Sequence, residues 1–238
     1  MKEQESIVEA FNEMAPRYEN LMNSELKRFW GWSYAEFADV LLNKIKIQAN
    51  DTILDVATGT SYLPARLIQE HKNLKQIVGL DITLGMLRNG KKRLISLPGA
   101  DIIEMLCASA LAMPLPAQFF DVILCGLATH HMDVKVLLAE MHRLLKPEGT
   151  IAILDVGGSP SWKNPLVKLF IRVLAFVYFF ITENKSRAWA EASALTNIRT
   201  AQEWRADLLE LGFNDFEISE LQSRKIWVPN PLVIYAKK

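Results

Sequence analysis

The chain has 238 residues, a formal net charge of zero and 23% charged residues. That length can bury a full core, either as one large α/β domain or as two small ones, and the lack of any basic block argues against a nucleic-acid partner. The two cysteines, Cys107 and Cys125, lie in apolar runs without metal-ligand spacing, and the polar residues 1–6 contain no apolar signal core. We therefore expect a protein of the reducing cytoplasm, with no disulfide scaffold and no bound metal.

Five short apolar runs rich in β-branched residues alternate with segments of helical periodicity. The periodic segments include Leu84–Leu97 and Val134–Leu145. Such alternation predicts a parallel sheet with helices packed on both faces and joined by right-handed crossovers. The predicted strands are 52–57, 76–81, 101–107, 120–126 and 150–155.

The pattern changes around the fifth of these strands. Pro147 and Gly149 predict a turn that ends one helix before the strand begins. After the strand, a Gly-Gly-Ser-Pro break leads to an aromatic-rich segment and then to an amphipathic helix at 201–211. The last two predicted strands, near 214–221 and 231–237, have no helix between them, so they should be antiparallel to each other.

The turn after the first strand carries the first functional signal. Ligands of open α/β sheets bind beyond the carboxyl ends of the strands, beside the first strand. Ala57 and Gly59 leave room there for backbone N–H groups to approach a ligand, and Ser61 can cap the helix that follows. Asp81 ends the second strand twenty-two positions after Gly59 (81 minus 59), a spacing typical of an acid that binds ribose hydroxyls. This combination predicts a nucleoside site, although the turn alone is common in α/β proteins for structural reasons.

Five segments of the chain, two of which contain the residues just described, form a series of motifs in a fixed order. They are Phe11–Tyr18 (FNEMAPRY), Asp55–Thr60 (DVATGT), Gly79–Leu87 (GLDITLGML), Met113–Leu115 followed by Phe120–Ile123, and Arg143–Gly149 (RLLKPEG). In this order they resemble the Rossmann-like S-adenosylmethionine-dependent methyltransferases, especially the group that methylates ubiquinone and menaquinone precursors. The resemblance implies a doubly wound, seven-stranded, mostly parallel α/β sheet with N-terminal helices and an inserted apolar helical lid. It also implies one domain made of a cap at 1–50, a cofactor-binding core at 51–155, a lid at 156–199, and a helix with a strand pair at 200–238.

The resemblance further implies S-adenosylmethionine as cofactor and assigns roles to single residues. Asp55 would lie near the methionine amino group, Asp81 would accept both ribose hydroxyls, and Ser109 stands where the family has an adenine-binding aspartate. The N-terminal segment would fold over the cofactor. The implied cofactor-binding residues are Tyr18, Asp55, Ala57, Gly59, Asp81, Ile82, Met86, Ser109 and Ala110.

Two adjacent histidines, His130 and His131, follow the fourth predicted strand. That strand lies beside the first one in this fold, so its carboxyl end faces the transferable methyl group. A histidine there can take a proton near neutral pH from a phenol, enol or amine. Because neighbours on an extended segment point to opposite sides, we expect one of the pair to be the base, His131 before His130. The alternative is that one of them packs structurally.

The apolar segment Leu166–Ile181 is short for a membrane span and contains Lys168 and Arg172. We expect a lid over a lipophilic acceptor, with a homodimer interface as the main competitor and membrane-surface contact as a further option. The predicted function is methyl transfer to carbon or oxygen of a hydrophobic small molecule of quinone-precursor, polyketide or terpenoid type, as in secondary metabolism. The alternatives are another reaction on the same fold, such as cyclisation, and a non-catalytic partner subunit.

Overall fold

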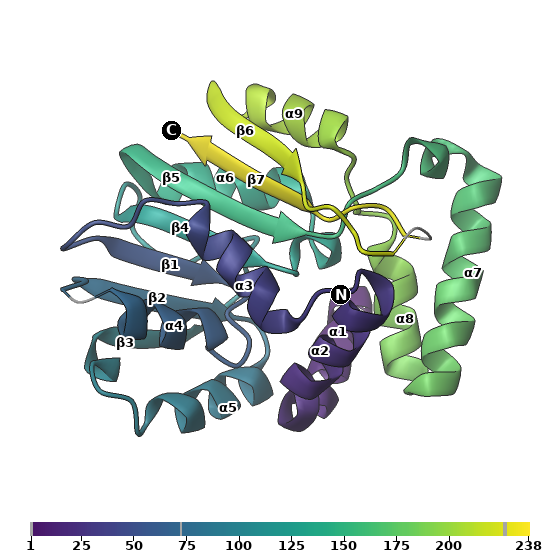
Figure 1. The fold of residues 1–238 in the computed structure, drawn as a ribbon, viewed down its shortest axis with the longest axis horizontal. Helices are drawn as coiled ribbons and strands as arrows, with labels where there is room; N and C mark the ends of the chain where they lie inside the picture. Colours follow the sequence, from purple (N-terminus) through teal and green to yellow (C-terminus); the bar gives the residue numbers. More distant parts are fainter. Residues whose placement is uncertain (1, 72, 226–227) are drawn as a thin grey trace.

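A seven-stranded sheet forms the centre of the structure, a computed structural model that describes residues 2–71, 73–225 and 228–238. The strand order is β3-β2-β1-β4-β5-β7-β6, with β7 antiparallel to both of its neighbours and the other pairs parallel (Figure 1). This confirms the predicted α/β class and the antiparallel closing pair. The strands are β1 (Thr52–Val56), β2 (Gln76–Asp81), β3 (Ile103–Cys107), β4 (Phe120–Gly126), β5 (Leu145–Asp155), β6 (Asp215–Glu220) and β7 (Leu232–Lys237).

Helices cover both faces of the sheet, which explains why the central strands are apolar at successive positions. Ile53 and Leu54 of β1 are both fully buried, but they belong to different cores. Ile53 packs on the side of α3 (Tyr34–Asn43) and α4 (Tyr62–Glu70). Leu54 packs on the side of α6 (Val134–Leu144) and α9 (Ala201–Glu210). The remaining helix of the sheet layers, α5 (Leu84–Leu94), contacts β2 and β3.

Four other helices gather at the carboxyl ends of the parallel strands instead of on the sheet faces (Figure 1). They are α1 (Lys2–Met14), α2 (Tyr18–Phe29), α7 (Pro165–Thr182) and α8 (Lys185–Ala194). Helices α1 and α2 precede β1 in the sequence, whereas α7 and α8 follow β5. The two parts meet where α1 packs on α8. Short 3-10 turns complete the structure at Ala15–Arg17 (η1), Ala100–Ile102 (η2), Thr129–His131 (η3) and Pro160–Lys163 (η4).

Three predicted boundaries differ from the structure by two residues or more. The fifth strand begins at Leu145, because the expected turn around Pro147 is a bulge within the strand. Its register jumps from Phe120 opposite Leu145 to Val122 opposite Thr150, and the extra residues include Glu148 with a positive φ of 65°. The third strand begins two residues late, since 101–102 belong to η2, and helix α5 ends three residues before the predicted Leu97.

The predicted apolar helix is present as α7, but it is not a core helix. Only Phe179 of its 18 residues is buried. Among the described residues it is the one helix that by length and composition could cross a membrane. The helix instead lies at the edge of the molecule, with α8 alongside it (Figure 1).

Candidate functional site

The turn between β1 and α4 is tied down by backbone contacts to β2. Ala57, Gly59 and Ser61 all have φ near +56°, with values of 57°, 55° and 57°. In this alternating left-handed conformation, the N–H groups of Thr58 and Gly59 both point to acceptors at the end of β2. The Gly59 N–H donates to Asp81 Oδ2 at 2.9 Å, and the Thr58 N–H donates to the Leu80 carbonyl at 2.9 Å. The turn therefore contacts Asp81 directly.

Ser61 does not cap helix α4, so that prediction was wrong. Its left-handed backbone carries the side chain away from the helix N-terminus, and no capping bond forms. The buried Oγ has no hydrogen-bond partner in the described structure. It lies instead against Gly90 of α5, where an added Cβ would collide with it. Ser61 is thus a packing residue between two helices.

Asp81 presents a buried carboxylate at the end of β2. Its Oδ1 accepts the Thr83 N–H at 2.7 Å and its Oδ2 accepts the Gly59 N–H. Burial raises the pKa of Asp81, whereas these two donors favour the charged form. Each carboxylate oxygen keeps a further lone pair for a ligand, which is what recognition of two adjacent hydroxyls requires.

Beyond Asp81 lies a cavity of about 380 Å³, which we call the Asp81 cavity. Part of its wall consists of residues at the carboxyl ends of the strands. Residues of α1 and of the C-terminal end of α8 form another part. Of the predicted cofactor residues, the cavity brings together Ala57, Asp81, Ile82, Ser109 and Ala110. Gly59 and Met86 do not line it; Met86 is buried in the core, with 2% of its surface exposed.

Tyr18 and Asp55 lie next to this cavity but outside its wall. Tyr18 contacts the tip of the turn, where a Cβ on Gly59 would be 3.9 Å from its ring, and it packs edge-on against Tyr34. Asp55 lies at the end of β1, with 1% of its surface exposed. Its Oδ2 has no hydrogen-bond partner in the described structure, and the nearby Thr58 side chain favours the charged form of the carboxyl. A buried, unpaired carboxylate oxygen fits a cationic ligand group, as the resemblance implied for the amino group of methionine.

Asp55→Asn is expected to stabilise the ligand-free protein at alkaline pH. Burial raises the pKa of Asp55 from 3.8 to about 7. The folded state therefore holds this proton where the unfolded chain releases it, and stability is lost as the pH rises from about 4 through about 7. Between pH 5 and pH 8 the wild type should lose about 3 kcal/mol more than the variant. Urea unfolding at both pH values measures this difference; equal losses in the two proteins would contradict it.

His130 is oriented by a carboxylate at the end of β5. Its Nδ1 lies 2.6 Å from Asp155 Oδ1. Asp155 also accepts the backbone N–H of His130 at 3.0 Å, the backbone N–H of Val156 at 2.7 Å and the hydroxyl of Thr129. Burial opposes protonation of His130, but the Asp155 carboxylate outweighs it and raises its pKa. With the proton on Nδ1 bonded to Asp155, the Nε2 atom is left as a proton acceptor.

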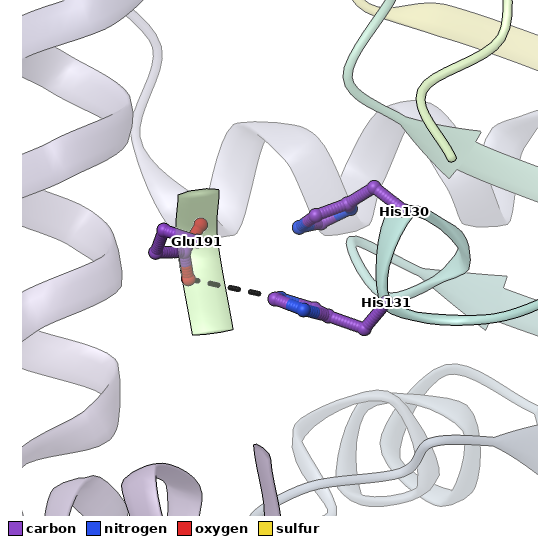
Figure 2. Close-up of side chains that lie close together, drawn as sticks. All are labelled: His130, His131 and Glu191. Carbon is purple, nitrogen blue, oxygen red and sulfur yellow. Dashed lines mark ion pairs between the residues drawn. The ribbon is translucent and has the colours of Figure 1, made fainter. Parts of the chain in front are cut away.

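His131 lies beside His130 and does not point to the opposite side (Figure 2). The two ring centroids are 4.2 Å apart. The expectation of opposite directions was wrong, because the pair belongs to the 3-10 turn η3 and not to an extended segment. His131 Nε2 is 3.7 Å from Glu191 Oε1, and burial, with the charges of its neighbours, lowers the pKa of His131 well below its usual range. A histidine with so low a pKa is a weak base, which favours a structural role for His131.

Three charged residues that the sequence did not single out complete this region. Arg187 of α8 is 3% exposed. Its Nη2 lies 3.1 Å from Glu25 of α2 and 3.0 Å from Glu191. Its guanidinium also lies over the rings of Phe11 and Phe179. Only the i, i+4 spacing of Arg187 and Glu191 hinted at this pair in the sequence, and nothing there indicated the contact with Glu25.

Ligand atoms of His130, His131 and Glu191 lie within 4.8 Å of one another, close enough to surround a metal ion (Figure 2). The sequence predicted no metal. The geometry adds an electrostatic reason, since the buried guanidinium of Arg187 already pairs with Glu191 and repels a second cation.

Two cavities adjoin the histidines on the side of the cap helices. The inner cavity, about 90 Å³, is lined by both histidines together with Tyr18, Arg187 and Glu191. The larger one, about 1050 Å³, we call the α7 cavity. His130 and Glu191 lie in its wall, which is otherwise rich in aromatic and aliphatic side chains. These include Phe29, Trp30, Trp162, Ile171, Leu174, Tyr178 and Phe179.

Comparisons with known proteins agree with this architecture. A family model described as a methyltransferase domain matches residues 54–153. The chain is 26% identical over 196 residues to a demethylmenaquinone methyltransferase of Listeria monocytogenes, with 80% of each chain covered. It is 26% identical over 222 residues to the ubiquinone/menaquinone biosynthesis C-methyltransferase UbiE of Geobacter sulfurreducens, which covers 89% of this chain and 82% of that protein.

Among solved structures, the fold is similar to that of geranyl diphosphate C-methyltransferase from Streptomyces coelicolor A3(2), solved with Mg²⁺, geranyl diphosphate and S-adenosylhomocysteine. The TM-score is 0.67 at 14% sequence identity, and the match covers 92% of this chain and 83% of the other. A protein named YcgJ from Bacillus subtilis matches with the same TM-score of 0.67 and covers 86% of this chain.

Proposed function

We propose that this chain, which is an S-adenosylmethionine-dependent methyltransferase similar to the ubiquinone and menaquinone biosynthesis enzymes, methylates carbon or oxygen of a hydrophobic small molecule. The observation that carries the proposal is the position of His130. It is held by Asp155 on one side and lies in the wall of a large, aromatic-lined cavity on the other. An apolar acceptor with one ionisable oxygen or carbon fits that combination.

We place the donor in the Asp81 cavity. Bound there, S-adenosylmethionine would supply a methyl group on a sulfonium centre, which already has a good leaving group. The residues of this chain would then serve mainly to position the donor. Asp81 would accept the ribose hydroxyls, the unpaired oxygen of Asp55 would meet the amino group, and Ile82 and Ser109 would lie against the adenine. Gly59, Ala57 and Tyr18 would shape the turn around the methionine part.

We assign the role of base to His130 instead of His131, in reverse of the order expected from the sequence. Its Nε2 is the free proton acceptor of an Asp-His pair, and it shares the wall of the α7 cavity, where the acceptor would lie. His131 instead lines both the Asp81 cavity and the inner cavity. It would separate the donor from the charged cluster around Arg187.

The acceptor class is inferred from the α7 cavity and from the relatives. Both curated relatives carry names of quinone-precursor methyltransferases, and the Streptomyces enzyme is named for an isoprenoid acceptor. Those names describe acceptors with apolar bodies, in keeping with the aromatic wall built by α2 and α7. The inner face of α7 would act as the lid over such a molecule.

Transfer of labelled methyl from S-adenosylmethionine to phenolic, naphtholic and terpenoid acceptors tests the proposal directly. Labelled product from one of these classes, with no transfer to polar amines, supports it. Conversion of an acceptor without incorporation of label would instead identify another reaction, such as cyclisation. No binding of the donor by calorimetry would identify a non-catalytic subunit.

Ser109→Asp should tighten donor binding about fivefold, because a charge-assisted hydrogen bond would replace a neutral one to the adenine amino group. The Ser109 hydroxyl accepts the Leu111 N–H at 3.2 Å, and a carboxylate could keep that bond with one oxygen. Titration with S-adenosylhomocysteine measures the change, with Ser109→Asn as the neutral control. Weaker binding of the aspartate variant would mean that Ser109 does not face the adenine.

A further inference from the structure

The inner cavity contains a connected group of polar side chains in a wall that is otherwise largely aromatic and aliphatic. Arg187 Nη2 lies 3.1 Å from Glu25 Oε2 and 3.0 Å from Glu191 Oε1. The same Glu191 oxygen lies 3.7 Å from His131 Nε2, and the ring of His131 packs beside that of His130. Polar groups therefore follow one another from His130, in the wall of the α7 cavity, to Glu25 on α2.

Two buried atoms of this cavity wall have no hydrogen-bond partner among the described residues. They are Arg187 Nε and His131 Nδ1, and buried polar atoms are normally satisfied by protein or by ordered water. The Arg187 guanidinium would repel a cation, and the carboxylates of Glu25 and Glu191 would repel an anion. Water both donates and accepts, so it fits all of these groups. A volume of about 90 Å³ has room for a few waters at about 30 Å³ each.

Waters in this cavity can bridge the distance between His130 and Glu25. Figure 2 shows the rings of His130 and His131 extending toward Glu191. A ring nitrogen of His130 and a carboxylate oxygen of Glu191 lie within 4.8 Å of each other. One water spans that gap, since two hydrogen bonds of about 2.8 Å at a tetrahedral angle reach about 4.6 Å. The Glu25 side chain is 14% exposed, so it can exchange a proton with the solvent.

The proposed methyl transfer produces a proton that needs such a path. An O–H or C–H bond of the acceptor breaks, and an N–H bond forms at His130 Nε2. The sulfonium loses its positive charge as the methyl group leaves it, so one proton must leave the site in each turnover. While acceptor or product fills the α7 cavity, that side of His130 is closed to bulk water.

We propose that waters in the inner cavity carry this proton from His130 to Glu25, an inference that rests on the proposed function. The N–H bond at His130 breaks and an O–H bond forms at Glu25. Each water between them accepts one proton and gives one, so the waters end unchanged. Glu25 then releases the proton to solvent at α2, while Arg187 and Glu191 hold the waters in line.

The charges around Glu25 suit a group that takes up a proton and releases it. Burial raises the pKa of Glu25 to about 7, and Arg187 opposes that shift. Burial opposes protonation of His130, but the Asp155 carboxylate raises its pKa. A proton can therefore pass from His130 to Glu25 near neutral pH. The other titratable groups that face Glu25 are Glu191, Glu183 and Tyr18.

A high-resolution crystal structure of the ligand-free protein tests the first part of the proposal. Ordered waters should bond to Arg187 Nε and His131 Nδ1, and they should connect His130 with Glu25. A dry cavity, or a chain of waters that is broken between these two residues, would overturn the relay.

The timing of proton release tests the second part. In a single turnover with labelled S-adenosylmethionine and an acceptor that the wild type methylates, the label reports methyl transfer and an indicator dye reports the proton. The two should coincide in the wild type. In Glu25→Gln, proton release should lag behind methyl transfer about tenfold or more. Glu25→Asp keeps a carboxyl group and should remove most of the lag. Glu9→Gln is the control, because Glu9 is an exposed acid of α1 outside the inner cavity.

Proton release that keeps pace with methyl transfer in Glu25→Gln would contradict the relay, whereas a wild type that transfers no label would contradict the proposed function. If Glu25→Gln does not fold, the wild type alone decides between the outcomes. Its rate of proton release in mixtures of H₂O and D₂O should curve with deuterium content, because several protons move together along a water chain. A linear dependence would indicate a single transfer straight to solvent and would exclude the relay.

Discussion

His130→Gln is expected to reduce turnover by about 10²–10⁴-fold while leaving the affinity for S-adenosylhomocysteine unchanged. The reason is that His130 is the one histidine in the wall of the α7 cavity, and its free Nε2 can take the acceptor's proton. It makes no contribution to the wall of the Asp81 cavity. Single-turnover kinetics with a saturating donor, together with calorimetry, separate the two effects.

The pH profile gives this prediction a second readout. Asp155 raises the pKa of His130 despite its burial. Because only the neutral ring can accept a proton, wild-type turnover should fall as the pH decreases through that raised pKa, and the Gln variant should lack this limb. His131→Gln is the matched control, since its pKa lies well below the usual range and it stays neutral. If both variants keep near-normal turnover, the acceptor needs no base and positioning alone drives the reaction.

Asp81→Ala should weaken the binding of S-adenosylhomocysteine by between about tenfold and 150-fold. The substitution removes charge-assisted hydrogen bonds to two hydroxyls, a loss of about 1.5–3 kcal/mol. It also removes the acceptor for the N–H groups of Gly59 and Thr83, so the glycine turn keeps only the bond from the Thr58 N–H to the Leu80 carbonyl as a tie to β2. Both effects act in the same direction, and calorimetry measures their sum.

Asp81→Asn separates the two contributions to donor binding. The amide oxygen can still accept one backbone N–H, so the turn keeps part of its support while the negative charge is lost. Asp101→Ala serves as the control for removal of an acid, because Asp101 is exposed and lies in η2. Unchanged affinity in Asp81→Ala would exclude Asp81 from the donor site.

The sheet was predictable because its strands are buried on both faces. Runs such as residues 52–56 and 120–126 are mostly apolar, with apolar residues at consecutive positions, which indicates central parallel strands without any tertiary information. Where a strand contains a bulge, local signals mislead: Pro147 and Gly149 suggested a turn, yet pairing on both sides of the bulge keeps them within β5. The spacing of Gly59 and Asp81 predicted a nucleoside site, and the structure adds a direct contact between the two residues, which follow adjacent strands.

The side-chain environment at the strand ends was less accessible from the sequence. The direction of His130 and His131 depends on a three-residue 3-10 turn, which has no distinctive sequence pattern. Asp155 was expected only as the last residue of a strand, and its bond to His130 arises from the alignment of β4 with β5. Arg187 looks like a surface residue of a short helix, and it is buried because α1 and α2 return from the other end of the chain.

The origin of the residues around the α7 cavity has an evolutionary consequence. Between residues 51 and 155, His130 alone contributes to its wall; the others come from before β1 or after β5. The Asp81 cavity, by contrast, is built largely from residues 57–133. Under the proposed function, mutation of outer-segment residues that line the α7 cavity alone would therefore alter acceptor preference while the Asp81 cavity stays unchanged. A lineage with this fold could acquire new products by changing its terminal and inserted segments while the central sheet stays under constant selection.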